Sequence, residues 1–131
     1  MALGLDLTFD HIHLYCSDLT ATEHWFITCL DAKLLRRRTN KGAPASDLQL
    51  GGTTIFLRGR QTDEEIAAPA PKHFGTDHFG FRVRDLASTA AELRKRGVEF
   101  AVEPYETRPG LRITFLRGPD NVLIELLQYD E

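Results

Sequence analysis

The sequence has few features of a secreted, membrane-spanning or nucleic-acid-binding protein. Its 131 residues include only two cysteines, Cys16 and Cys29, which are too few for a disulfide scaffold and favour a reducing, cytoplasmic location. No apolar run approaches the ~20 residues that cross a bilayer, and the N-terminus lacks the basic and apolar regions of a signal peptide. Sixteen Lys and Arg against nineteen Asp and Glu leave a net charge of −3. We therefore expect neither a nucleic-acid partner nor a membrane partner.

The residues that are present are those of one small globular domain. Apolar residues make up 42% of the chain and charged residues 27%, which are ordinary values for a protein with a packed core. The length leaves room for one domain and is too short for two domains of ordinary size. Composition alone gives no function, so the order of the residues has to supply it.

An internal repeat divides the chain into two modules. Residues 10–19 and residues 77–86 both read Asp-His, six residues, then Asp-Leu, and the two segments are 67 positions apart. A second match relates residues 55–59 (IFLRG) to residues 114–118 (TFLRG). Two matches in so short a chain favour a duplication. We therefore interpret residues 1–131 as a single domain with module one at about 9–59, a linker at about 60–76 and module two at about 77–128.

Each module is expected to contain a strand, a helix and three further strands. Alternating apolar residues near 11–16 and 78–83 indicate the first strand of each module. The first helix is expected to begin at the capping-box sequence Thr20–Glu23, and the second to begin after the N-cap Asp85 and to stop at Gly97. The later strands are expected at 33–38, 46–50 and 53–58, with a Gly51-Gly52 hairpin turn, and at 98–102, 111–116 and 122–128. This is an α+β fold in which the two modules complete one another, because neither buries enough surface alone.

The alternation also predicts which side chains face away from the helices. Apolar residues of each strand are expected to pack on a helix, so the polar residues between them share the opposite face. This face is expected to carry His11, His13, Tyr15, Gln49, Arg58, His78, Arg82, Arg112, Thr114 and Glu125. One interpretation is a face that is simply solvated, which is the commoner situation for a single His or Arg. The other is a cleft in which these polar groups meet a ligand or a metal ion.

Three residues of that face are candidate metal ligands. His11 and His78 occupy equivalent positions of the repeat. Glu125 lies within the apolar segment 122–127, where a charge is costly unless it is exposed, paired or bound to a cation. Two imidazoles and a carboxylate on strands suit a divalent metal such as Zn, Ni, Co, Mn or Fe.

Two other motifs receive a structural interpretation. The run Arg36-Arg37-Arg38 suggests an anion site, but three arginines at a strand edge more often form a solvated edge, where positive charge resists aggregation, and this second interpretation is preferred. Cys16 and Cys29 are expected to fill the core rather than to act as nucleophiles.

With these motifs the chain resembles the vicinal oxygen chelate superfamily, which includes glyoxalase I, methylmalonyl-CoA epimerase, fosfomycin-resistance proteins and extradiol dioxygenases. The resemblance covers about residues 9–128 and rests on the two Asp-His…Asp-Leu segments and on residues 117–126, RGPDNVLIEL. It implies two tandem strand–helix–three-strand modules that form a U-shaped half-barrel around one divalent metal. It also implies a homodimer, and in some members the cleft is formed across the two subunits.

The resemblance places the metal ligands of the family on His11, His78 and Glu125. A fourth ligand, common on the last strand of the first module, corresponds to Phe56, whose ring cannot coordinate a metal and would instead line the substrate site. Gln49 and His13 are candidate replacements for that ligand. Glu125 and Tyr15 are the catalytic candidates, Glu125 as a ligand that can serve as base and Tyr15 as a hydrogen-bond donor. The remaining substrate-binding candidates are Thr114 and the three arginines that favour an anionic substrate, Arg58, Arg82 and Arg112.

Three functions are compatible with this resemblance. The preferred one is a lyase or isomerase of the glyoxalase I or epimerase type, which chelates a small substrate through adjacent oxygens and stabilises an enediolate-like intermediate. The second is an Fe(II) extradiol dioxygenase, which uses the same ligand set, although most characterised members are longer. The third is a fosfomycin-type transferase or a metal-free resistance protein that binds a small molecule. The metal-free proteins usually lack the ligands that this chain retains.

Overall fold

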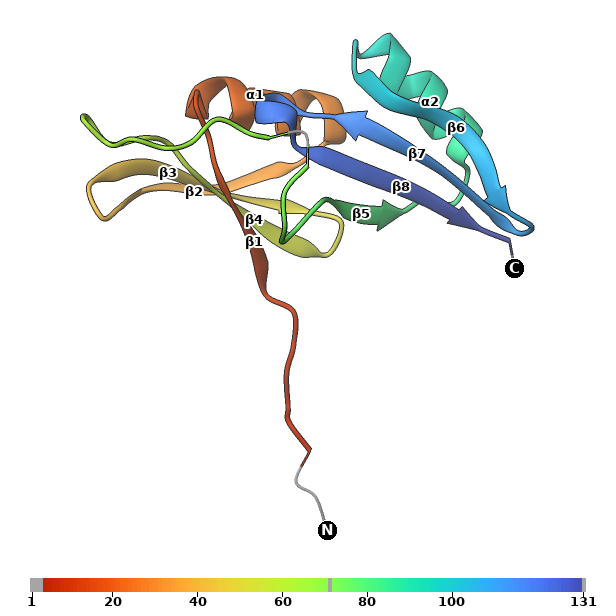
Figure 1. Ribbon diagram of the computed structural model, residues 1–131, viewed down its shortest axis with the longest axis horizontal. Coiled ribbons are helices and arrows are strands. Elements are labelled where there is room, and N and C mark those ends of the chain that lie inside the picture. Colours follow the sequence, from red (N-terminus) through yellow and green to blue (C-terminus); the bar gives the residue numbers. More distant parts are fainter. Residues whose placement is uncertain (1–3, 71, 131) are drawn as a thin grey trace.

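The computed structural model describes residues 4–70 and 72–130, which form two four-stranded sheets with two α-helices (Figure 1). Sheet A contains β1 (His11–Tyr15), β2 (Lys33–Asn40), β3 (Ala43–Leu50) and β4 (Thr53–Arg58). Sheet B contains β5 (Phe79–Arg82), β6 (Glu99–Arg108), β7 (Leu111–Arg117) and β8 (Leu123–Tyr129). The helices are α1 (Leu19–Leu30) and α2 (Leu86–Lys95), and a short 3₁₀ turn, η1 (Pro119–Asn121), precedes β8. Within the described residues, no helix has the length and apolar character needed to cross a membrane.

The two modules repeat one topology. The strand orders are β1-β4-β3-β2 and β5-β8-β7-β6, and in each sheet the first strand runs parallel to the last while the other neighbours are antiparallel. A parallel pair needs a crossover connection, and the first crossover passes through α1 and the second through α2. Both sheets are open, and Figure 1 shows both helices above the strands. The predicted α+β architecture of paired strand–helix–three-strand modules is confirmed.

Each helix begins at the aspartate of a repeated Asp-Leu pair. The Asp18 carboxylate accepts a hydrogen bond from the Ala21 backbone at 3.0 Å, and the Asp85 carboxylate accepts one from the Ser88 backbone at 3.2 Å. These contacts satisfy backbone N–H groups that a helix N-terminus leaves without partners. The predicted capping box at Thr20–Glu23 is wrong, because Glu23 is buried and faces the sheet instead of the helix start.

One hydrophobic cluster contains residues of both modules. Its fully buried side chains include Phe26, Leu48 and Ile55 from module one and Leu116 and Ile124 from module two. The two cysteines lie in the same cluster without a disulfide, as expected. Burial raises the pKa of the Cys16 thiol to about 11, so this thiol is not poised to act as a nucleophile.

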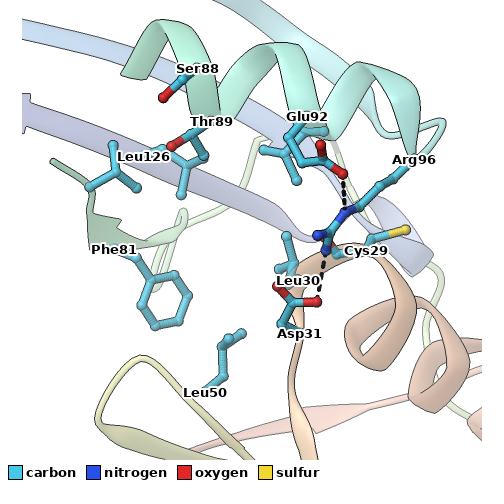
Figure 2. Close-up of a pocket in the computed structure, with 12 residues that line it drawn as sticks. Cys29, Leu30, Asp31, Leu50, Phe81, Ser88, Thr89, Glu92, Arg96 and Leu126 are labelled. Atoms are coloured by element: carbon cyan, nitrogen blue, oxygen red, sulfur yellow. Dashed lines mark hydrogen bonds and ion pairs between the residues drawn. The ribbon is translucent and has the colours of Figure 1, made fainter. Parts of the chain in front are cut away.

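Arg96 joins the two modules on the helix side of the sheets (Figure 2). Its Nη1 donates to the Cys29 carbonyl at 3.1 Å and to the Asp31 carboxylate at 2.8 Å, while its Nε donates to Glu92 at 3.0 Å. Beside these hydrogen bonds is a pocket of about 400 Å³ whose wall includes Phe81. The Arg96 side chain therefore ties the end of α1 to α2 across the module boundary.

The turn between β3 and β4 approaches module two closely. Gly51 and Gly52 have φ of 57° and 82°, the left-handed values that a two-residue hairpin turn of this kind requires. A Cβ atom at Gly51 would lie 2.5 Å from the Phe81 ring. The predicted Gly51-Gly52 hairpin is confirmed, and glycine at the first of these positions also permits the contact with Phe81.

Candidate metal and substrate site

The pairing register of sheet A determines which side chains lie on its face turned away from α1. Along the parallel pair β1 and β4, His11 lies opposite Thr54, His13 opposite Phe56 and Tyr15 opposite Arg58. Along β3 and β4, Asp47 lies opposite Phe56 and Gln49 opposite Thr54. We call this surface the open face of sheet A. It includes, as the alternation predicted, His11, His13, Tyr15, Gln49, Phe56 and Arg58.

Sheet B presents different residues on β7 from those that were predicted. Glu125 lies opposite Gly80 and Phe115, whereas Thr114 lies opposite Leu126 and Arg112 opposite Gln128, on the helix side. Thr114 is fully buried and donates to the Val102 carbonyl at 2.6 Å. Placing Arg112 and Thr114 on the face turned away from the helices was wrong, because β7 has apolar residues on both faces and its alternation does not decide between them.

His78 and Glu125 come together on the face of sheet B that is turned away from α2. Nε2 of His78 lies 3.2 Å from Oε1 of Glu125, and the Phe115 ring lies edge-on to the imidazole at 4.8 Å between centroids. Gly80 keeps space beside Glu125, because a Cβ atom there would lie 3.1 Å from the Glu125 carbonyl oxygen and 3.3 Å from its Cβ. The carboxylate is thus held in a mostly buried position on β8 with an imidazole as its partner.

Each of these repeat histidines is bound by the aspartate that precedes it. Nδ1 of His11 lies 2.7 Å from the Asp10 carboxylate, and Nδ1 of His78 lies 2.8 Å from the Asp77 carboxylate. A carboxylate at Nδ1 orients the imidazole ring so that Nε2 points away from that carboxylate, as in histidines that bind metals. The Asp-His dipeptides served only as markers of the repeat in the sequence, and their orienting role emerges from the structure.

His11 lies in an aromatic and cationic environment. Its imidazole stacks on the Phe56 ring with 3.9 Å between centroids, so a phenyl ring occupies the position expected for a fourth ligand. The Arg38 guanidinium carbon lies 5.1 Å from the centroid of the same ring. Burial, followed by the charges of His11, Arg38 and Arg58, lowers the pKa of the neighbouring His13 below its ordinary value. His13 is therefore a neutral group at neutral pH.

The residues present fit a divalent metal in part. His78 and Glu125 supply an imidazole nitrogen and a carboxylate oxygen that lie close together, and Asp77 orients the imidazole. Across residues 4–70 and 72–130, no three His, Cys, Asp or Glu side chains form a group that would hold a metal. One chain thus brings together two of the three predicted ligands, and His11 stands on the sheet of the other module.

Two of the predicted substrate-binding arginines are already engaged. Arg58 is buried, donates from Nη2 to Glu64 of the linker at 2.7 Å, and lies 4.8 Å from the Tyr15 ring centroid. This ion pair holds the pKa of the Glu64 carboxyl below its usual range. The Arg82 guanidinium carbon lies 4.4 Å from the centroid of the Tyr129 ring. Arg58 lies on the open face of sheet A, where the Glu64 carboxylate already neutralises it. Arg82 lies opposite Leu127, on the face of sheet B that carries Glu125, as predicted.

The run Arg36-Arg37-Arg38 has carboxylate partners that the sequence interpretation did not predict. Arg36 and Arg38 lie on the open face of sheet A, and both donate through Nε to the fully buried Asp47, at 2.7 and 3.0 Å. Arg37 points to the helix side and binds Glu23 at 2.6 Å. The run lies on β2, the edge strand of sheet A, and Arg36 and Arg37 are exposed, as the solvated-edge interpretation expected. That interpretation did not predict that all three arginines make ion pairs. The signal that was overlooked is Asp47, a charge in an otherwise mostly apolar strand.

The sequence matches a known family and curated relatives. The model of the Glyoxalase/Bleomycin resistance protein/Dioxygenase superfamily matches residues 8–126. The uncharacterized protein YwkD of Bacillus subtilis is 29% identical, over 90% of this chain and 94% of its own length. A protein of Synechocystis named "Probable lactoylglutathione lyase" is 27% identical, over 90% of this chain and 92% of its own length. The "Probable lactoylglutathione lyase, chloroplastic" of Arabidopsis thaliana is also 27% identical, but this chain spans only 35% of it.

Solved structures share the fold. A glyoxalase family protein from Enterococcus faecalis has a TM-score of 0.79 and 25% identity, covering 92% of this chain and 97% of its own. A glyoxylase/bleomycin resistance protein/dioxygenase domain from Frankia also has a TM-score of 0.79 and 25% identity, with 96% and 99% covered. These likenesses extend over both modules and agree with the paired architecture described above.

Proposed function

The chain belongs to the Glyoxalase/Bleomycin resistance protein/Dioxygenase superfamily, and we propose that it is a divalent-metal-dependent enzyme of the glyoxalase I or epimerase type. It would act as a lyase or isomerase on a small anionic substrate bound through adjacent oxygens. The observation that carries this proposal is the pair of oriented histidines, each with an aspartate at Nδ1, together with Glu125 at 3.2 Å from His78. The two relatives named as lactoylglutathione lyases support the same reaction class.

The proposed ligands are Nε2 of His78, the carboxylate of Glu125 and Nε2 of His11. Because His11 does not form a three-ligand group with His78 and Glu125 among the described residues of one chain, we propose that the third ligand comes from a second copy of the chain in a homodimer. Zn, Ni, Co, Mn and Fe all suit this set of two nitrogens and one carboxylate. When bound, the metal supplies the Lewis acidity that stabilises negative charge on substrate oxygens.

The protein groups of the proposed site have separate tasks. Glu125 is the proposed base and accepts at Oε1 the proton removed from a substrate carbon. Tyr15, whose side chain is exposed on the open face of sheet A, donates its hydroxyl to the substrate. His13, Gln49 and Phe56 line the same face and contribute polar and aromatic contacts. A cytoplasmic location stays a prediction from the sequence.

An Fe(II) ring-cleaving dioxygenase is the second candidate. The observation that favours it is the stacking of Phe56 on His11, which leaves no protein ligand at the fourth position and preserves the two-His, one-carboxylate set. A fosfomycin-type transferase, or a metal-free protein that binds a small molecule, is the remaining alternative. Metal content separates the metal-free alternative from the enzymes, and the reaction catalysed separates the enzymes from one another.

The test begins with metal analysis of the dimer fraction of protein purified without added metal. We expect one divalent metal per chain in the unmodified protein and in His24→Ala, a control at an exposed helical histidine, and little in His78→Ala or His11→Ala. Equal metal content in all four proteins, or none in the unmodified one, contradicts the proposal. Conversion of methylglyoxal and glutathione to lactoylglutathione would support the lyase. Oxygen uptake with a catechol would replace it by the dioxygenase.

A further inference from the structure

The open face of sheet A carries a pair of arginines to which the proposed metal site gives no task. We propose that Arg36 and Arg38, anchored by the buried Asp47, bind a carboxylate or phosphate group of the ligand that lies against His11 and Phe56. The inference rests on the proposed function for the location of the ligand. It deepens that function by assigning the group that recognises the anion.

The charges around Asp47 do not balance. The Asp47 side chain is 0% exposed and accepts hydrogen bonds from Nε of Arg36 at 2.7 Å and from Nε of Arg38 at 3.0 Å. One arginine would neutralise this carboxylate, and the second leaves a net positive charge at the surface of the sheet. The other pairs are balanced, because Arg37 binds Glu23 and Arg58 binds Glu64. An excess positive charge on a face that is expected to hold a ligand favours an anionic group.

The two guanidinium groups are oriented for such a group. In the part of the chain that the structure describes, the hydrogen bonds of Arg36 and Arg38 all use Nε, which leaves the Nη1 and Nη2 groups available. These side chains are 66% and 30% exposed, so solvent and ligands reach them. A guanidinium fixed by a buried carboxylate loses less conformational freedom on binding, and its planar pair of N–H groups matches a carboxylate or a phosphate.

The position of Arg38 connects the pair to the proposed site. Its guanidinium lies over Phe56, and Phe56 stacks on His11. The three side chains therefore form a continuous row across the open face from the anion-binding group to the proposed metal ligand. A small molecule with an anionic group at one end and chelating oxygens at the other would lie along this row. Asp47, the buried carboxylate that anchors both arginines, lies opposite Phe56 in the register.

The experiment measures anion binding to the full-length protein after a chelator has removed divalent metals. Dissociation constants for inorganic phosphate and for malonate are determined by NMR titration of the arginine Nε–H signals. For Arg38→Gln we expect the affinity for at least one probe to fall about tenfold, the cost of a charge-assisted hydrogen bond. Arg38→Lys should recover part of the affinity because it restores the charge but not the planar pair of donors. The probe that responds more strongly distinguishes a phosphate from a carboxylate ligand.

Arg94→Gln is the matched control. Arg94 also lies over a phenylalanine, with its guanidinium carbon 4.3 Å from the Phe100 centroid, but it pairs one-to-one with Glu103 away from the site. The affinity of the Arg94→Gln protein for either probe should equal that of the unmodified protein. Equal affinities in Arg38→Gln and the unmodified protein, or an equal loss in Arg94→Gln, would overturn the inference. If Arg38→Gln does not fold, Arg36→Gln supplies the same test from the more exposed arginine.

The outcome is separable from that of the proposed function. Metal content depends on His11, His78 and Glu125, whereas anion affinity in metal-free protein depends on Arg36 and Arg38. If the protein as purified contains no metal, and Arg38→Gln loses anion binding, the anion site is retained and the metalloenzyme is rejected. If the protein as purified contains one metal per chain, and Arg38→Gln binds anions as tightly as the unmodified protein, the metalloenzyme is retained and the anion site is rejected.

Discussion

The carboxylate of Asp77 lies 2.8 Å from Nδ1 of His78, and its counterpart Asp10 lies 2.7 Å from Nδ1 of His11. The repeat thus preserves a pair of residues, an orienting acid and an oriented base, in both modules. In module two, Nε2 of His78 lies 3.2 Å from Oε1 of Glu125. The duplication therefore repeats a local arrangement suited to metal binding as well as the strand–helix–three-strand topology.

We expect Asp77→Asn to weaken metal binding about 10- to 100-fold, because the neutral amide fixes the imidazole less firmly and lowers its basicity. Competition with a chromophoric chelator measures the change. Asp63→Asn, at an exposed linker residue, should leave the affinity unchanged. An identical affinity in Asp77→Asn and Asp63→Asn would show that the Asp77 contact has no part in metal binding.

Gly80→Ala should disturb Glu125 through sterics alone. The added Cβ would lie 3.1 Å from both the Glu125 carbonyl oxygen and the Leu127 Cδ1, so these neighbours must move by a few tenths of an ångström. We expect a loss of about 1–3 kcal/mol in the free energy of unfolding, as for other overpacked sites, with weaker metal binding. Urea unfolding measures the loss. Gly4→Ala, which would meet nothing within 4 Å, is the control and should unfold like the parent protein.

The environment of the Glu23 carboxyl should make the free energy of unfolding depend on pH. Hydrogen bonds from Arg37 and Ser46 lower the pKa of its carboxyl from the ordinary 4.5, and the hydrogen bond from Arg37 is the largest cause. A carboxyl whose pKa is lower in the folded state adds stability above the unfolded pKa and loses it as pH falls through the folded pKa. The difference in unfolding free energy between the parent and Glu23→Gln should therefore be largest above about pH 4.5.

Urea unfolding at pH 7 and at lower pH values measures this difference. We expect about 1–3 kcal/mol at pH 7, the cost of breaking a buried charged hydrogen bond. Glu65→Gln, at an exposed position in the linker, is the control and should follow the parent at every pH. A difference for Glu23→Gln that stays constant down to the lowest pH would contradict the assignment.

The parts of the fold that were predictable have a local signal. The clean alternation of β1 and β5 and the Asp-Leu pairs before both helices identified the two modules. The capping box was misleading because Glu23 has partners at positions 37 and 46, which only the tertiary structure brings near. Similarly, β7 is apolar on both faces, so only its pairing with β8 decides that Phe115, and not Thr114, lies beside Glu125.

The sequence indicated which residue types belong to the candidate site, but it did not indicate how they are arranged in space. His78 and Glu125 meet within one chain, while His11 stands on the other sheet, a separation that strand periodicity does not report. The ion pairs of Arg36, Arg37 and Arg38 were not predictable for a related reason. Consecutive arginines in a strand point to alternate faces, and their carboxylate partners, Glu23 and Asp47, lie on different elements.

Phe56→Glu should strengthen metal binding. The Phe56 ring stacks on the His11 imidazole at 3.9 Å, so a carboxylate at this position would lie beside the proposed ligand and add a fourth donor atom. Because Arg38 lies over the same ring, the new carboxylate would also have a cationic neighbour that lowers the cost of its charge. Phe56→Leu removes the ring without adding a donor and serves as the control. Chelator competition should show tighter binding in Phe56→Glu than in Phe56→Leu. Equal affinities in the two variants would mean that residue 56 does not face the metal, and would place His11 outside the coordination sphere as well.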